Sequence, residues 1–147
     1  MIFNLRFVVP ARTFMLVRVV GLVIFFVAFL LPACRDPFGT VYPGWKCAQI
    51  TLGATVAPDA YTSWDVLAVL SGLINPLAVL ALLLSFSKRL YGLKLGFFLA
   101  TVLFAACTWV FFFRAGVVPL VGHFLWIAGA LILVFSSAFF LPERPRA

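Results

Sequence analysis

Four long stretches of this chain carry no charged residue, and they constrain its fold more than any other feature. Asp, Glu, Lys and Arg are absent from residues 19–34, 66–87, 95–113 and 115–142. A helix needs about 20 apolar residues to cross the hydrocarbon core of a bilayer, and three of the stretches are long enough as they stand. The first becomes long enough when it is extended back to Thr13, because the long side chain of Arg18 can snorkel to the headgroups from one turn inside the boundary.

The composition supports a membrane protein. Of the 147 residues, 65% are apolar and 10% are charged, whereas soluble domains have about 45–50% and about 25%. A soluble single-core domain is therefore excluded. We predict an all-α fold, an antiparallel bundle of four transmembrane helices that forms a single domain over residues 1–147, with Pro119 in the tolerated first turn of the last helix. The expected helices cover about residues 13–31, 65–86, 94–113 and 118–141.

The basic residues predict the orientation of the bundle, because Lys and Arg near the ends of spans stay on the cytoplasmic side. Most of them precede the first helix, lie between the second and third, or follow the fourth. Arg35, Lys46 and Arg114 lie on the opposite side, where three Asp residues balance them. Both termini are therefore expected in the cytoplasm. The net charge of +7 follows from this topology and from attraction to anionic lipid, so we expect a lipid bilayer as partner and no nucleic acid.

The largest connection is the outer loop, residues 32–64. Its Pro and Gly residues predict turns and extended pieces, with a short strand at residues 49–52. Cys34 and Cys47 lie in this loop, on the oxidising side of the membrane, whereas Cys107 lies within the third helix. We therefore expect a structural Cys34–Cys47 disulfide, which would close a loop of about 14 residues and stabilise it by about 3 kcal/mol on the chain-entropy account.

Two alternatives compete for these cysteines. Residues 31–34, Leu-Pro-Ala-Cys, resemble a bacterial lipoprotein processing box, and cleavage there would leave three helices and a lipidated Cys34. Pro32 and the long segment before the apolar run argue against it. A redox-active pair is the other alternative, although the Cys-X-X-Cys motif that usually lowers a thiol pKa is missing.

Polar residues near the outer ends of the predicted helices form a candidate polar site, which consists of Asp65, Asn75, Arg114 and His123. We expect an ion pair between Asp65 and Arg114. A histidine beside such a pair could bind a quinone headgroup or relay a proton, although a lone histidine is more often a hydrogen-bonded residue at a helix end. Metal binding is not supported, since no second His or acidic ligand stands at a suitable spacing.

The second helix is predicted to kink, because Pro76 cannot donate a hydrogen bond to the carbonyl of Gly72. Asn75 or Thr101 could bond that carbonyl instead. Asn75 is expected to face protein, where a polar side chain acts as glue between helices.

The third helix begins with a ridge of small residues, Gly92, Gly96 and Ala100, which permits close helix contact. Ala68 and Gly72 give the second helix a matching pair. The ridge is therefore expected to serve the contact between these two helices, with self-association or contact with another membrane protein as the alternative.

Three short motifs give the chain a resemblance to known proteins. Leu31-Pro32-Ala33-Cys34, Tyr42-Pro43-Gly44-Trp45-Lys46-Cys47 and Asn75-Pro76-Leu77 resemble a loose group of small bacterial four-helix membrane proteins with a Pro-Gly-Trp outer loop and no assigned activity. The resemblance implies a location in the bacterial inner membrane. Claudins are similar in architecture, with a large first outer loop that holds a Trp and two cysteines, but here Cys34 precedes Trp45.

The motifs of phosphate binding, metalloproteases and serine hydrolases are missing from the chain. No charged residue stands at mid-bilayer, where proton-coupled transport usually needs one. We therefore predict a non-enzymatic membrane protein of accessory, structural or interaction type, without catalytic residues, metal or cofactor. The alternative is a small-molecule or quinone-binding protein, or a small transporter, with a site near the outer face. A cavity that reaches Asn75 would favour the alternative.

Overall fold

The computed structural model describes residues 7–53, 63–85, 87 and 90–142, with the side chains of residues 52, 53, 63–65 and 142 left aside. Its helices confirm the four predicted spans to within a few residues. The segments that are long and apolar enough to cross a bilayer are Ala11–Leu30, Val66–Leu84, Tyr91–Ala115 and Val121–Phe139.

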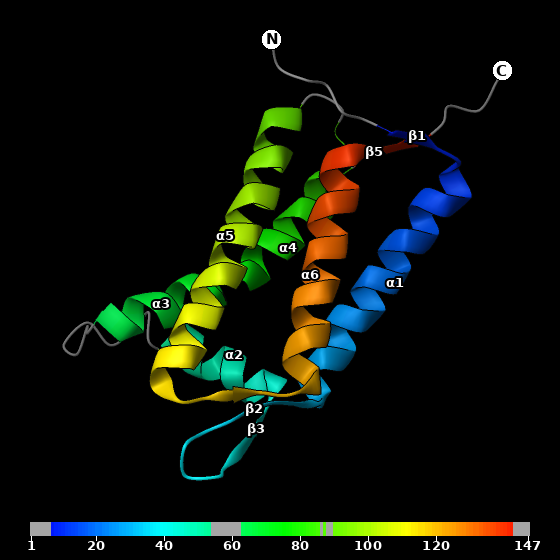
Figure 1. Ribbon diagram of the computed structural model, residues 1–147. Coiled ribbons are helices and arrows are strands. Elements are labelled where there is room, and N and C mark those ends of the chain that lie inside the picture. Colours follow the sequence, from blue (N-terminus) through cyan, green and yellow to red (C-terminus); the bar gives the residue numbers. More distant parts are fainter. Residues whose placement is uncertain (1–6, 54–62, 86, 88–89, 143–147) are drawn as a thin grey trace, which may run out of the picture.

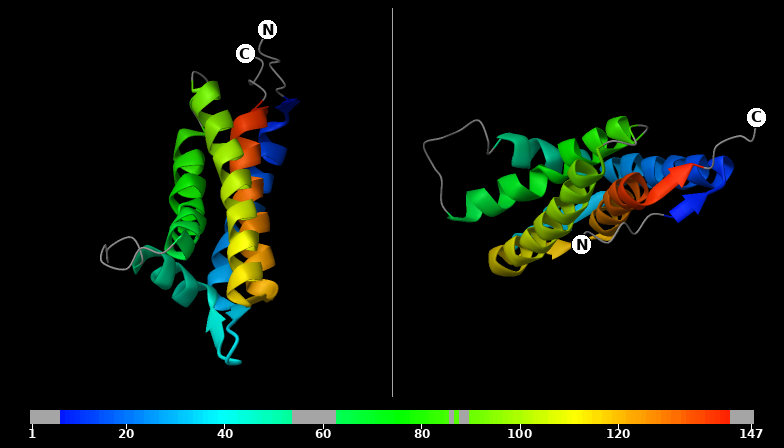
Figure 2. Two further views of the ribbon diagram at one scale, coloured as in Figure 1. Left: turned by 60° about the vertical axis from the view of Figure 1, so that its left-hand side comes forward. Right: turned by 90° about the horizontal axis from the view of Figure 1, so that it is seen from above.

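The first and last long helices, α1 (Ala11–Leu30) and α6 (Val121–Phe139), make the most extensive contact in the molecule. Helix α5 (Tyr91–Ala115) packs beside α6, as Figures 1 and 2 show. A Cβ atom at Gly129 would lie 2.6 Å from the backbone nitrogen of Phe25, so the backbones of α1 and α6 meet where a side chain would not fit. The buried core lies between the helices and consists of Phe25, Ile74, Ala78, Ala105, Ala130 and Leu133.

The second span consists of two helices, α3 (Ser63–Gly72) and α4 (Ile74–Leu84), separated at Leu73. The kink predicted from Pro76 is thereby confirmed. The two side chains expected to bond the carbonyl of Gly72 bond elsewhere. Asn75 Oδ1 accepts a hydrogen bond from Trp126 Nε1 at 2.7 Å, and Thr101 Oγ1 donates one to the carbonyl of Phe97 at 2.8 Å. Asn75 thus faces protein, as expected.

Two small sheets close the ends of the bundle. Strand β1 (Phe7–Val9) pairs in parallel with β5 (Phe140–Pro142) at what we call the terminal end. At the opposite end, which we call the loop end, β2 (Pro32–Arg35) lies between β3 (Val41–Pro43) and β4 (Val118–Pro119). The fold is therefore mostly helical but not all-α, because the segments that enter and leave the helices pair with one another.

The loop end also corrects two local predictions. Pro119 lies in β4 instead of the first turn of the last helix, because the N–H of Leu120 donates to the carbonyl of Ala33 at 2.8 Å and keeps this segment extended. Residues 49–52 lie within helix α2 (Gly44–Gly53), not in a strand. Alternation over four residues is too short to distinguish a strand from a helix. Figure 1 shows α2 lying across the end of the bundle.

The terminal end holds two buried cations. Arg18 does not extend to the headgroups as expected: it is 4% exposed, packs its guanidinium 3.9 Å from the centre of the Phe14 ring, and donates to Ser85 Oγ. Lys94 donates to the carbonyls of Ser85 and Ser87, at 3.0 and 2.6 Å. These bonds join the start of α1 and of α5 to the end of α4.

The small-residue ridge of α5 does not serve the predicted contact. Gly92 and Gly96 are exposed, and a Cβ atom on either would meet nothing within 4 Å. Gly72 instead approaches Thr51 of α2. The predicted contact is wrong because the helical rotation of α5 turns the buried face, with Lys94, Thr101 and Thr108, toward the bundle. Self-association through the ridge stays a prediction.

Candidate ligand-binding cavity

A cavity of about 240 Å³ lies at the loop end, between the covering elements β2, β3 and α2 and the helices α3, α5 and α6. Its walls are mostly apolar, with the rings of Phe29, Phe111, Phe112 and Trp126 and the small side chains of four alanines, Ala28, Ala33, Ala48 and Ala68. A dry engineered cavity of about 150 Å³ binds benzene. The cavity of this protein is therefore large enough for one substituted ring.

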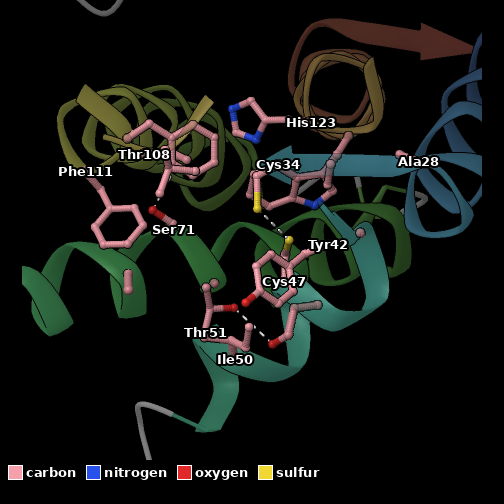
Figure 3. A pocket seen from close by; sticks show the side chains of 18 of the residues that line it. Ala28, Cys34, Tyr42, Cys47, Ile50, Thr51, Ser71, Thr108, Phe111 and His123 are labelled. Carbon is pink, nitrogen blue, oxygen red and sulfur yellow. Dashed lines mark hydrogen bonds between the residues drawn. The ribbon is translucent and has the colours of Figure 1, made fainter. Parts of the chain in front are cut away.

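Two cysteines face one another in the wall of this cavity. Strand β2 places Cys34 and helix α2 places Cys47, and their sulfur atoms point toward each other in Figure 3. The Sγ–Sγ distance is 3.2 Å, whereas a disulfide bond measures about 2.05 Å. The prediction that these two cysteines meet is right, but the predicted disulfide is not present: both are thiols in hydrogen-bond contact.

The contact gives the two thiols different pKa values. The hydrogen bond with Cys47 lowers the pKa of Cys34, because it stabilises the thiolate, although burial and the nearby Asp36 act in the opposite direction. The same bond, together with burial, raises the pKa of Cys47. Cys34 is therefore the thiol that ionises first, with the S–H of Cys47 as its donor.

The backbone holds the two cysteines in this relation. The N–H of Gly44, the first residue of α2, donates to the carbonyl of Leu31 at 3.0 Å, and β2 is hydrogen-bonded on both sides by β3 and β4. The sheet thus fixes the strand that carries Cys34, and the Gly44–Leu31 bond ties the start of the helix that carries Cys47 to the residue before this strand.

His123, in the first turn of α6, also lines the cavity. Its side chain is 3% exposed, and its Nε2 atom has no hydrogen-bond partner among the described residues. Aromatic rings surround the imidazole, with Phe112 at 4.6 Å and Trp126 at 5.6 Å between ring centres. A buried polar atom without a partner costs about 1–3 kcal/mol.

Two hydrogen-bonded pairs supply further polar groups of the wall. Thr108 Oγ1 donates to Ser71 Oγ at 2.8 Å and joins α5 to α3, and the Trp126–Asn75 bond joins α6 to α4. These side chains already have partners. They shape and stabilise the cavity, while the two thiols and the imidazole of His123 are the groups that can interact with a ligand.

At the edge of the cavity, Asp36 closes the turn between β2 and β3. Its carboxylate accepts the N–H of Phe38 at 2.9 Å and that of Thr40 at 2.8 Å, and the hydroxyl of Tyr42 donates to it at 3.2 Å. Desolvation acts to raise the pKa of Asp36, but these hydrogen bonds outweigh it and lower the pKa below its ordinary value.

The structure assembles part of the predicted polar site. Asn75 and His123 line the cavity. Arg114 is exposed at the end of α5 and does not line it. The side chain of Asp65 lies outside the described residues, so the Asp65–Arg114 ion pair stays a prediction. Thr108 and Trp126 were not predicted from the sequence, although Thr108 lies two helical turns after Thr101 and hence on the same face of α5.

Comparison with protein-family models, with curated proteins and with solved structures found no match for this chain. The resemblance based on the Pro-Gly-Trp loop therefore stays a prediction. Among the described residues, no three His, Cys, Asp or Glu side chains gather as a metal site would require. The chemistry available to the cavity comes from its two thiols and its imidazole.

Proposed function

We propose that this protein binds a small, mostly apolar ring compound with hydrogen-bonding substituents in the loop-end cavity. The observation that carries the proposal is an apolar cavity of about 240 Å³ whose wall includes the buried imidazole of His123. Apolar walls with a few directed polar groups are typical of ligand sites. A lipid-soluble quinone matches this pattern, because its carbonyl groups project from an apolar ring.

The orientation forms part of the proposal. The terminal end, where Lys94 and Arg18 lie, is assigned to the cytoplasm because basic residues accumulate there. The loop end, and with it the cavity, then faces the other compartment.

Ligand binding is favoured over a purely accessory role by the extent of the cavity. It reaches Asn75 in the second span as well as the covering loop, which an interaction protein with a solid interior would not need. The accessory role remains the second candidate, supported by the exposed ridge with Gly92 and Gly96 on α5.

Binding can be measured by isothermal titration calorimetry on the full chain in lipid nanodiscs. The probe is tetramethylhydroquinone under anaerobic conditions, since this reduced ring cannot oxidise thiols during the titration. We expect saturable binding with one site per chain, above the partitioning measured with empty nanodiscs. Partitioning alone, equal to that of empty nanodiscs, would contradict the proposal.

A cavity-filling variant locates the site. Ala68→Leu adds three carbons to a side chain that lines the cavity and is 8% exposed, and we expect it to weaken binding at least tenfold. Ala100→Leu adds the same atoms on α5 away from the cavity and should bind as the unmodified protein does. If Ala68→Leu does not fold, Ala48→Leu fills the same cavity from α2. Equal binding by the filled variant and the control would place the ligand elsewhere and overturn the proposal.

A further inference from the structure

We propose that Cys34 and Cys47 are a redox-active dithiol that passes two electrons to a quinone bound in the loop-end cavity. This inference rests on the proposed function, since it requires the ring to occupy the cavity. It assigns to the pair a chemistry that goes beyond binding, and a role for the cysteines other than a permanent crosslink.

The first support is the position of the sulfurs. Both line the same cavity at an Sγ–Sγ distance of 3.2 Å, so an approach of about 1 Å forms a disulfide of normal length. A ring in the cavity would lie against the thiols without any opening of the fold. The third cysteine, Cys107, does not line the cavity and offers an internal control.

The second support is the asymmetry of the pair. The hydrogen bond between the two thiols lowers the pKa of Cys34 and raises the pKa of Cys47. Thiol–disulfide chemistry needs one thiolate that attacks and one thiol that follows. Cys34 suits the first role and Cys47 the second.

The third support is a group that can interact with the oxygen of the ring. The imidazole of His123 lines the same cavity. A protonated ring nitrogen donates a hydrogen bond to a quinone carbonyl, and an unprotonated one accepts a hydrogen bond from the hydroxyl of the product. His123 is therefore assigned as the residue that positions the ring and stabilises the oxygen as it gains negative charge.

The reaction balances with the quinone as the oxidant. Two S–H bonds break and one S–S bond forms between Cys34 and Cys47, which releases two electrons and two protons. The quinone accepts both electrons, its two carbonyl oxygens become hydroxyls, and the product is one hydroquinone. A reductant of the dithiol class on the same side of the membrane would restore the thiols by exchange.

The experiment mixes the reduced full chain in nanodiscs with tetramethyl-1,4-benzoquinone under anaerobic conditions. Every ring carbon of this probe is substituted, so a thiol cannot remain attached by replacing a ring hydrogen. We expect one hydroquinone per chain by absorbance and an intact mass two hydrogens lower. Alkylation after the reaction should then label Cys107 alone.

Variants separate the roles of the residues. Cys34→Ser and Cys47→Ser should each abolish hydroquinone formation, whereas Cys107→Ser should form as much as the unmodified protein. His123→Ala should slow the reaction at least tenfold. If that variant does not fold, His123→Gln serves for the same measurement, with a smaller expected loss of rate because its amide can still bond the ring oxygen.

The outcomes also separate this inference from the proposed function. Saturable binding of the hydroquinone without oxidation of the thiols by the quinone would overturn the redox role and leave ligand binding intact. Absence of both binding and oxidation would overturn both. Oxidation at equal rates in Ala68→Leu and Ala100→Leu would show that the electrons leave by a route outside the cavity, and would also overturn the inference.

Discussion

The contact between α1 and α6 and the cavity beside it are built from similar residues but differ in what they leave open. At the contact, Gly129 allows the backbone of α6 to touch that of Phe25 in α1. In the cavity wall, alanines and aromatic rings surround about 240 Å³ of unfilled space. Small residues alone therefore do not close an interior.

The direction of the backbone accounts for the difference. Helices α1 and α6 run without interruption through their contact, so small residues on facing surfaces allow the two backbones to approach. The second span changes direction at Leu73, and Figure 1 shows α3 diverging from the line of α4. Helix α2 lies against α3 near this break, where Gly72 approaches Thr51. The cavity lies between α2 and the rings of α5 and α6.

The largest effect is expected from Gly129→Ala at the contact. The added Cβ would lie 2.6 Å from a backbone nitrogen, which cannot rotate away as a side chain could, so α1 and α6 must separate. Overpacking of this kind costs about 1–3 kcal/mol. Thermal unfolding of the purified chain, monitored by size-exclusion chromatography, should show a lower midpoint temperature than that of the unmodified protein.

Two further glycines calibrate that result. Gly21→Ala meets mainly the side chain of Ile132, at 2.7 Å, and should lose less stability than Gly129→Ala. The added Cβ of Gly96→Ala meets nothing within 4 Å. This variant should lose no stability, because alanine has a higher helix propensity than glycine. Equal midpoints for Gly129→Ala and Gly96→Ala would show that the contact is not closed as described.

A smaller effect is expected from Trp126→Phe in the cavity wall. The variant keeps an aromatic ring but removes the N–H that bonds Asn75 at 2.7 Å. Hydrogen bonds between membrane helices contribute about 0.6 kcal/mol on average, so the loss of stability should be of that order. The free energy of unfolding in mixed micelles measures it, with the 43% exposed Trp109 changed to Phe as the control. A loss as large as that of Gly129→Ala would mean that the wall, and not the contact, carries the stability.

The smallest effect concerns Asp36 and depends on pH. Because hydrogen bonds hold its pKa below the ordinary value in the folded loop, the carboxylate stabilises the turn above the unfolded pKa of about 3.9, and this contribution is lost as the pH falls through the lower folded value. Asp36→Ala should raise hydrogen exchange at the amides of Phe38 and Thr40 at neutral pH. Asp36→Asn, which keeps one acceptor oxygen, should raise it less. Protection that is equal in all three proteins would contradict this role.

The sequence predicted the helices well because their signal is local. A span needs only a sufficient run of apolar residues, and the break near Pro76 follows from the missing N–H of proline. The strands escaped prediction because β1 pairs with β5 and β2 with β4, partners that are remote in sequence and too short for a periodic pattern.

The candidate site could be predicted only in part, because the sequence indicates the depth of a polar residue but not the direction in which its helix faces. Asn75 and His123 could be identified as polar residues at particular depths, and the cysteines as the pair that shares the loop. The involvement of Trp126 and Thr108 depends on which way α5 and α6 are rotated, which near-uniform apolar sequences do not indicate. The small-residue ridge was predicted to face the second span for the same reason, since the rotation of α5 could not be read from its sequence.

The pairing of β1 with β5 joins the segment before the first span to the segment after the last. Since α1 also makes its main contact with α6, the first span to leave a ribosome has its partner at the far end of the chain. A nascent chain that stops before residue 121 keeps Gly21 and Phe25 of α1 turned to lipid or to a temporary neighbour. Assembly is therefore completed after synthesis of α6, and a chain truncated within that helix would lose the contacts that α1, α4 and α5 make with it.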